Sequence, residues 1–125
     1  MQNSDILVCL LPSTPETRQL LNKETLSLLP IGSSLINVAR GDILKEDDLV
    51  ELLDNGHLTK ASLDVFINEP LDKNHAFWKH KKINISPHTA SITNPASVAQ
   101  QIVQNYHKMK KGEELLNMVS REKGY

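Results

Sequence analysis

Three side chains of this sequence could act together on a carbonyl group: Arg40, Glu69 and His88. Carbonyl reduction adds a hydride to carbon and a proton to oxygen, and histidine exchanges protons near neutral pH. A carboxylate such as Glu69 would favour the charged imidazolium form and orient the ring. A guanidinium such as Arg40 binds a carboxylate through two hydrogen bonds and polarises the carbonyl beside it. Together these residue types fit the reduction of a 2-keto acid.

Each of the three residues also has a plain structural explanation when it is taken alone. A histidine at the end of a strand is more often a surface or hydrogen-bonded side chain than a catalyst. Glu69 precedes Pro70, which is common at a turn or helix boundary, and Arg40 precedes Gly41, which is common in turns. The functional interpretation therefore depends on whether the fold brings the three together.

The elements that would position them are four apolar runs, which we expect to be strands: Ile6–Leu11, Leu35–Ala39, Leu63–Phe66 and Ile83–Ser86. The first run is continuously apolar, which is typical of a strand covered on both faces. Helical segments separate most of the runs, so the sequence predicts an α/β fold with a mostly parallel sheet and right-handed crossovers.

The expected helices are marked by caps and prolines. They are a short turn of helix opened by Pro15 and capped by Thr14, a helix Lys23–Leu29 capped by Asn22, a helix Glu46–Leu53 ended by Asn55-Gly56, and a long helix capped by Thr93 or Asn94 and ended by Gly112. The long helix has Pro95 in its first turn and apolar residues every three or four positions, at Val98, Ile102, Tyr106 and Met109. A polar tail, Leu115–Tyr125, follows.

Ligands of open parallel sheets bind beyond the carboxyl ends of the strands. The segment Pro12-Ser13-Thr14, Arg40, Asp64 and His88 all follow or lie in the expected strands. One edge of one sheet could therefore carry most of the chemically capable residues.

Composition narrows the function classes. The net charge of the 125 residues is -1, which favours neither nucleic acid nor an anionic membrane as a partner. The longest apolar run has six residues, far below the roughly 20 needed to span a bilayer. The single cysteine, Cys9, suits a reducing cytoplasm and is expected to be buried and inert. No histidine has metal-ligand spacing, and the serines lack the context of an esterase nucleophile, so we expect no metal site.

Four segments in order resemble the D-isomer-specific 2-hydroxyacid dehydrogenases: Leu11–Thr17, Asn37–Gly41, Leu63–Pro70 and Ser86–Ala90. The stretch Pro87–Ala96 and the ending Arg121–Tyr125 are most similar to the glyoxylate/hydroxypyruvate reductase A branch. The resemblance covers nearly the whole chain. One departure is Ala90, where many members have glycine.

The resemblance implies a role for each matching residue. Arg40 would hold the substrate carboxylate and carbonyl, His88 would be the general acid–base, and Glu69 would be its partner. Cofactor contacts would come from the same edge of the sheet: Leu11, Pro12 and Thr17 near the adenosine, the backbone at Val38 and Ala39 along the nicotinamide, Asp64 at the carboxamide, and Arg40 and His88 beside it.

The chain lacks the family's Gly-x-Gly-x-x-Gly, which would bind the pyrophosphate at a helix start. The resemblance therefore implies the second half of a doubly wound, Rossmann-like domain over residues 1–111, with a tail over residues 112–125. It implies NADP or NAD as cofactor, with NADPH favoured, and a small 2-keto or 2-hydroxy acid as substrate. We expect little activity from this chain alone, and a homodimer or self-association through an exposed sheet edge.

Two other interpretations remain at this point. A non-catalytic protein of the same fold that senses dinucleotides could keep Arg40, Glu69 and His88. A phospho-acceptor receiver domain shares the length and the α/β class, but it needs clustered acids after its first strand. This sequence has Pro12-Ser13-Thr14 at that position, which argues against a receiver domain.

Overall fold

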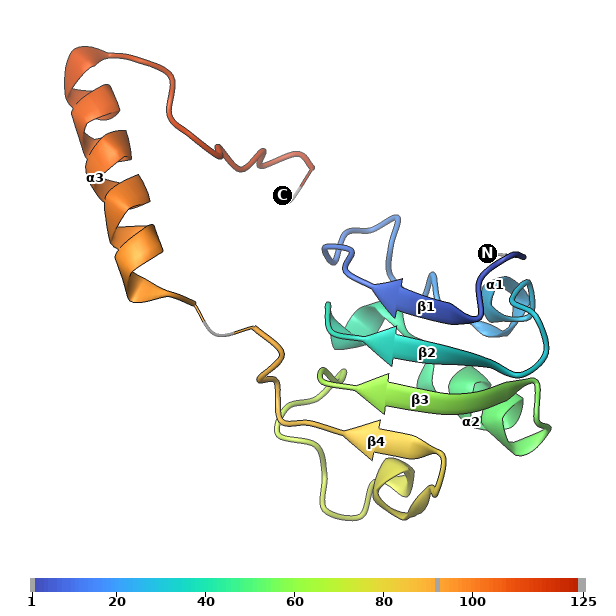
Figure 1. Cartoon of the computed structure of the whole chain (residues 1–125). Coiled ribbons are helices and arrows are strands. Elements are labelled where there is room, and N and C mark those ends of the chain that lie inside the picture. Colours follow the sequence, from blue (N-terminus) through green and yellow to red (C-terminus); the bar gives the residue numbers. More distant parts are fainter. Residues whose placement is uncertain (1, 92, 124–125) are drawn as a thin grey trace. The chain divides into compact units, whose positions relative to one another are not determined.

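The computed structural model describes residues 2–91 and 93–123, and the chain forms two compact units that divide after Ala90. The first unit is a four-stranded sheet with short helices, and the second contains one long helix (Figure 1). None of the helices in these described ranges has the length and apolar character needed to cross a bilayer.

The sheet of the first unit is parallel throughout, as the sequence predicted. Its strands are β1 (Ile6–Cys9), β2 (Ser33–Asn37), β3 (Leu58–Leu63) and β4 (Ile83–Ile85). They lie side by side in sequence order, and every neighbouring pair is parallel (Figure 1). All carboxyl ends therefore share one edge of the sheet.

The expected strand boundaries need correction. The third strand was expected at Leu63–Phe66, but β3 covers the six residues before Asp64. Leu58, Ala61 and Leu63 are buried in β3 while polar residues between them are at least partly exposed, so the strand has no continuous apolar run. β1 ends two residues earlier than expected, and β2 begins and ends two residues earlier.

Short helices connect the strands. They are α1 (Lys23–Leu26), the 3₁₀ turn η1 (Gly41–Ile43), α2 (Glu46–Asp54) and the 3₁₀ turn η2 (Ala76–Lys79). Asn22 caps α1 as expected, but α1 ends at Leu26 rather than Leu29. The segment after Pro15, expected to be a short helix, forms a hydrogen-bonded turn instead, in which the N–H groups of Thr17 and Arg18 both bond to the Thr14 carbonyl.

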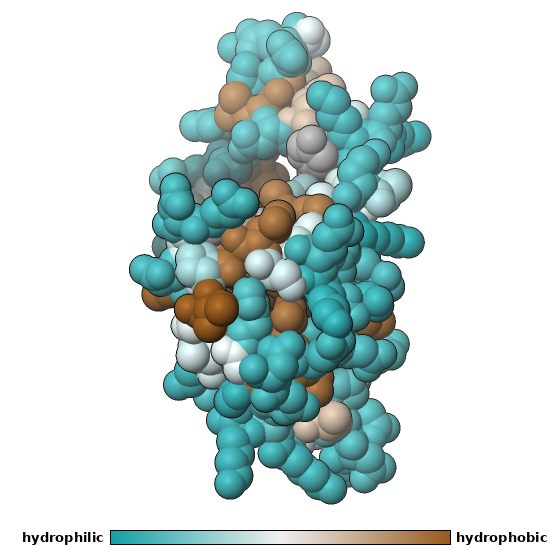
Figure 2. Space-filling model, turned by 90° about the vertical axis from the view of Figure 1, so that its right-hand side faces the viewer, coloured by the Kyte–Doolittle hydropathy of each residue, from teal (hydrophilic) through white to brown (hydrophobic). Residues whose placement is uncertain are grey.

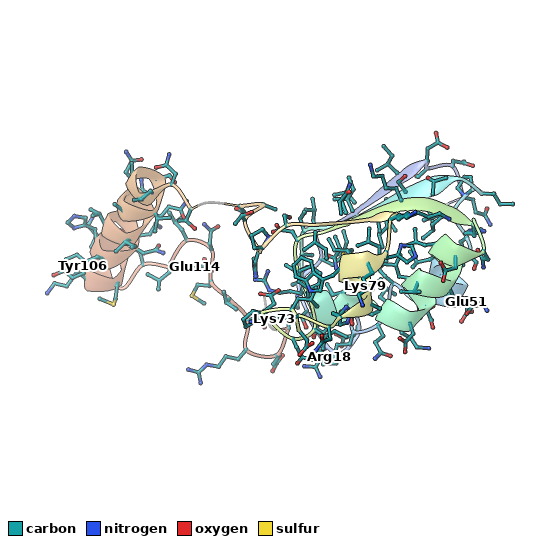
Figure 3. All side chains as sticks on the ribbon, turned by 90° about the horizontal axis from the view of Figure 1, so that it is seen from below. Arg18, Glu51, Lys73, Lys79, Tyr106 and Glu114 are labelled. Carbon is teal, nitrogen blue, oxygen red and sulfur yellow. The ribbon has the colours of Figure 1, made fainter. Side chains whose placement is uncertain are left out.

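The core lies between the sheet and the helices on one of its faces, as Figures 1 and 3 show. It is built from leucines of α1, β2, α2 and β3 together with Phe77 of η2. Residues of β1 are far more open: Ile6 is 59% exposed and Val8 is 47% exposed. Figure 2 shows apolar groups among a mainly hydrophilic surface. The expectation that the first strand is covered on both faces does not hold for the chain as it stands.

The second unit consists of α3 (Pro95–Lys111) and the segment that follows. Asn94 caps α3 by accepting a hydrogen bond from the Ala96 N–H, and Gly112 ends it with a φ of 71°. The side chain of Asn105 bonds to the backbone of Leu116 in both directions, at 3.1 and 2.8 Å. The expected apolar positions of this helix are all exposed. The last two residues of the expected tail lie outside the described residues.

Candidate active site

The three residues proposed for catalysis line one cavity at the carboxyl edge of the sheet. Arg40 follows β2, Glu69 follows β3 and His88 follows β4. The open cavity measures about 400 Å³ and is lined by Ser13, Arg40, Gly41, Asp42, Val65, Phe66, Ile67, Glu69 and His88. Parallel strands explain the convergence, because their carboxyl ends meet at the same edge.

Glu69 and His88 are joined directly. Nδ1 of His88 lies 2.7 Å from Oε2 of Glu69, and the other carboxylate oxygen accepts the Phe66 N–H at 2.9 Å. The hydrogen bond with His88, and then that from Phe66, lower the pKa of Glu69 below its ordinary value. The carboxylate is thus held charged and fixed at both oxygens. Nε2 is the imidazole nitrogen left to exchange a proton with a bound molecule.

Arg40 is placed by a buried asparagine. Oδ1 of Asn37 accepts the Ala39 N–H at 3.1 Å, and Nδ2 of Asn37 donates to the Arg40 carbonyl at 3.1 Å. Asn37 is fully buried, so the backbone of this turn is held by a side chain in the core. Arg40 is exposed, and Nη1 of its guanidinium donates a hydrogen bond to the Ala39 carbonyl. The other N–H groups of the guanidinium can bind a carboxylate.

Asp64 is buried and turned toward the segment that carries His88. Oδ1 accepts hydrogen bonds from the Ser86 hydroxyl and from the Thr89 N–H, and Oδ2 accepts the Ala90 N–H. Burial acts to raise the pKa of Asp64, but these three donors outweigh it and the pKa is lowered. Oδ2 keeps capacity for one further donor.

The residues expected near the adenosine form a self-contained turn. The Thr17 hydroxyl donates to the Pro12 carbonyl at 2.7 Å and accepts the Thr14 N–H at 2.8 Å. Leu11 is exposed, and Pro12 and Thr17 are partly buried. A second bond, from the Ser13 hydroxyl to Oδ2 of Asp42 at 2.6 Å, ties this turn to the one that follows β2.

The expected nicotinamide contacts at Val38 and Ala39 lie between β2 and Arg40. The Val38 N–H bonds to the Cys9 carbonyl at 3.4 Å, and the Ala39 N–H bonds to Asn37. Their amides are therefore used within the fold, and any contact to a cofactor must come from other atoms of this segment.

A second, smaller cavity of about 240 Å³ lies on another side of the Glu69–His88 pair. It is mainly apolar and is lined by Phe66, Glu69, Pro70, Leu71, Trp78, Ile85, Pro87 and His88.

The donor set suits part of a dinucleotide. The open cavity offers a cation, a proton donor and backbone close together, which suits the nicotinamide end and a small anionic substrate. The 125 residues contain no glycine-rich turn before a helix for the pyrophosphate. Within residues 2–91 and 93–123, no group of three or more acidic, histidine or cysteine side chains is arranged to hold a metal ion.

Sequence reasoning did not foresee the roles of Asn37 and Ser86. An asparagine at the end of a strand before a turn is the usual sign of a side chain that bonds to the backbone two residues on. That signal was present at Asn37. For Ser86 no such signal exists, because its partner Asp64 lies 22 residues away in the sequence.

Comparison with known protein families gives one match, over residues 1–90. The matching model is described as the D-isomer specific 2-hydroxyacid dehydrogenase, NAD binding domain. The match covers the whole sheet and the three candidate catalytic residues, Arg40, Glu69 and His88.

Solved structures give the same result over almost the whole chain. A D-isomer specific 2-hydroxyacid dehydrogenase from Xanthobacter autotrophicus Py2, solved with NADPH and MES, is 44% identical with a TM-score of 0.95, covering 99% of this chain and 51% of that one. An NADPH-dependent glyoxylate/hydroxypyruvate reductase from Sinorhizobium meliloti, solved with NADP and sulfate, is 32% identical with a TM-score of 0.93, covering 99% and 41%. The chain thus spans about half the length, or less, of these relatives.

Proposed function

The chain belongs to the D-isomer specific 2-hydroxyacid dehydrogenases, and from this premise we propose that it carries the catalytic residues of a 2-keto acid reductase. The observation that carries the proposal is the Glu69–His88 pair, 2.7 Å apart, in the cavity that also contains Arg40. An acid–base pair beside a free guanidinium matches the two needs of the reaction, a proton and an anchor for a carboxylate.

Each residue of the pair and the arginine has a separate task. Arg40 binds the substrate carboxylate and draws electron density from the adjacent carbonyl. His88 donates a proton from Nε2 to the carbonyl oxygen during reduction, and takes it back in the reverse direction. Glu69 holds the ring by Nδ1 and stabilises its protonated form. A reduced nicotinamide, when bound, supplies the hydride for the carbonyl carbon.

We propose NADP or NAD as the cofactor, with NADPH favoured because two similar structures were solved with NADPH or NADP. The contacts from this chain would be Leu11, Pro12 and Thr17 toward the adenosine, and Val38, Ala39, Arg40, Asp64 and His88 toward the nicotinamide. At Asp64, Oδ2 accepts one hydrogen bond, from the Ala90 N–H, and could accept a second from a carboxamide N–H.

The proposed substrates are small 2-keto acids, glyoxylate and hydroxypyruvate first. The support is the likeness to the Sinorhizobium meliloti reductase and the single exposed guanidinium in the open cavity. Because the 125 residues contain no glycine-rich turn for a pyrophosphate and span about half the length, or less, of these relatives, we expect the chain alone to show little turnover.

Three further proposals concern the chain as a whole. We propose self-association, as a homodimer or through β1, because β1 is an outermost strand of this sheet and its apolar side chains are exposed. We propose a cytoplasmic location, because the one thiol, Cys9, is buried and free. We also keep residues 1–111 as one functional domain with residues 112–125 as a tail, although the compact units divide at Ala90.

A chimera tests the function directly. The part of the Xanthobacter autotrophicus protein that this chain does not match is joined to residues 1–125, and oxidation of NADPH is followed with glyoxylate and hydroxypyruvate. We expect turnover that needs both halves. A folded chimera that binds NADPH but reduces neither compound contradicts the proposal and favours a non-catalytic dinucleotide-binding protein.

A further inference from the structure

We propose that Asp64 and Ser86 form a clamp that positions His88 for proton transfer. The proposal deepens the function proposed above and rests on it. The clamp consists of the buried Asp64 carboxylate and its three donors, the Ser86 hydroxyl and the N–H groups of Thr89 and Ala90. Ser86 is a positioning residue in this proposal, since it acts on the substrate through His88. Asp64 positions His88 in addition to the contact with the nicotinamide proposed above.

The backbone at His88 needs such support. Its φ is 54°, in the left-handed region that residues with a side chain rarely occupy. Left alone, the segment would relax to a more favourable φ and carry the imidazole elsewhere. The His88 N–H bonds to the carbonyl of Asp64 at 2.8 Å, which fixes the residue at the point of strain.

The carboxylate fixes the residues that follow. The Thr89 N–H bonds to Oδ1 at 3.0 Å, and the Ala90 N–H bonds to Oδ2 at 2.8 Å. Three successive N–H groups, from His88 to Ala90, therefore all point at Asp64. The two oxygens of the carboxylate accept the N–H groups of Thr89 and Ala90 separately, and a carboxylate has no donor to repel them.

The Ser86 hydroxyl completes the clamp from the other side of His88. It donates to Oδ1, while the Ser86 N–H bonds to the Leu63 carbonyl at 3.0 Å and continues the pairing of β3 with β4. The backbone is therefore hydrogen-bonded on both sides of His88, to β3 before it and to the Asp64 carboxylate after it.

This arrangement has a consequence at the imidazole. Its Nδ1 meets Glu69 at 2.7 Å, and Glu69 is itself held by the Phe66 N–H. The ring is held by one carboxylate and its backbone by another. Displacing the backbone would separate His88 from Glu69, and misplacing a catalytic group by about 1 Å can cost about a hundredfold in rate.

The substitution Asp64→Asn tests the clamp because it keeps the shape and turns one acceptor into a donor. Asp48→Asn is its matched control: Asp48 also accepts a backbone N–H, from Lys23 at 2.8 Å, and its pKa is also lowered. Ser86→Ala is paired with Ser62→Ala, since Ser62 lies on β3 and accepts only from Asn84 at 3.4 Å.

The first readout is NMR on the 125-residue chain. In Asp64→Asn we expect hydrogen exchange at the Thr89 and Ala90 amides to speed up about tenfold or more, the scale of one lost hydrogen bond. In Ser86→Ala, which removes no charge, we expect the pKa of Glu69 to rise toward its ordinary value, because its first cause of lowering is the bond with His88. In Asp64→Asn the lost charge of Asp64, which raises the pKa of Glu69, opposes that rise. Ser86→Ala should speed exchange at the same two amides by less, and the two controls should change neither the exchange rates nor the pKa of Glu69.

In Ser86→Ala, a purely structural role of the clamp would leave the pKa of Glu69 unchanged. If the two amides lose protection while the Glu69 carboxyl titrates as in the unmodified chain, the clamp does not position His88 and the proposal is overturned. If Asp64→Asn does not fold, Ser86→Ala decides by the same criterion, with Ser86→Thr expected to restore the hydroxyl and the low Glu69 pKa.

The second readout separates this proposal from the proposed function. In the chimera, Asp64→Asn and Ser86→Ala should lower kcat more than they raise KM for glyoxylate. Lack of turnover in the unmodified chimera would count against the function, whereas the NMR result on the clamp would stand by itself. Unchanged kcat in both variants of an active chimera would overturn the clamp alone.

Discussion

Gly41 and Phe66 approach each other so closely that no side chain fits between them. A Cβ on Gly41 would lie 2.0 Å from the Phe66 carbonyl carbon and 2.5 Å from the Ile67 nitrogen. These contacts are with backbone, which cannot swing aside as a long side chain can. The turn that carries Arg40 and the loop that leads to Glu69 are therefore packed directly against each other.

Gly41→Ala should push these two segments apart. We expect a loss of about 3 kcal/mol in the free energy of unfolding, at the upper end of overpacking costs. The control is Gly56→Ala, where a Cβ would meet nothing within 4 Å and only the φ of 81° is unfavourable. That control should lose about 1 kcal/mol. Urea unfolding measures both, and equal losses would mean that the close approach is unimportant.

His88→Ala in the chimera should lower kcat by about 10²–10⁴-fold, the usual contribution of a positioned acid–base. Arg40→Ala should raise KM and lower kcat together, because the guanidinium binds the carboxylate and polarises the carbonyl. His107→Ala serves as control, since His107 lies on α3 in the other unit. Near-normal turnover of glyoxylate by His88→Ala would remove His88 from the mechanism.

Glu69→Gln should shift the pH optimum of reduction to lower pH. Glu69 keeps its negative charge to unusually low pH, because the bond with His88 and the Phe66 N–H lower its pKa. The amide of glutamine has no charge, so the imidazole loses the carboxylate that favours its protonated form. The measurement is kcat/KM against pH for glyoxylate. An unchanged profile would show that Glu69 has no part in the proton transfer.

Acid should destabilise the first unit through Asp64 and Glu69. A carboxyl group whose pKa is lowered by folding contributes stability above its unfolded pKa, and that contribution is lost as the pH falls through the folded value. The ordinary values are 3.8 for Asp64 and 4.5 for Glu69, so the loss begins near pH 4.5 and grows below it. Urea unfolding between pH 7 and pH 3 should show a shallower decline in Asp64→Asn than in the unmodified chain.

The isolated chain should associate with itself and bind nicotinamide cofactors weakly. Val8→Lys should reduce the association, because it places a charge on the exposed outer strand β1. Ile31→Lys is the control, since Ile31 is 83% exposed but lies outside the strands. Light scattering and NADPH titration test both statements. A monodisperse monomer that binds NADPH at micromolar concentration would contradict them.

Much of the fold could be predicted from local signals. Asn22, Asn94 and Gly112 mark helix ends where the structure has them, because capping depends only on nearby residues. The third strand was misplaced because the signal used was an apolar run, and the residues after Leu63 are apolar for another reason. Val65 and Phe66 are buried in the connection beyond β3, where no strand continues.

The site could be assembled only in part. Arg40, Glu69 and His88 were found because their residue types suggest a reaction, and parallel strands bring them to one cavity. The supporting contacts were not visible. Ser86 and Asp64, like Gly41 and Phe66, are distant in sequence and meet only when β2, β3 and β4 are in register.

Because the three candidate catalytic residues follow neighbouring strands of one sheet, they could be moved together as one segment in recombination. In the proposed function, proton transfer and carboxylate recognition both come from residues between 40 and 88, and these 125 residues contain no glycine-rich turn for a pyrophosphate. Exchanging the complementary half should therefore change which dinucleotide is preferred without altering the acid–base chemistry. In protein engineering terms, the two specificities could be evolved in separate libraries and joined at one boundary.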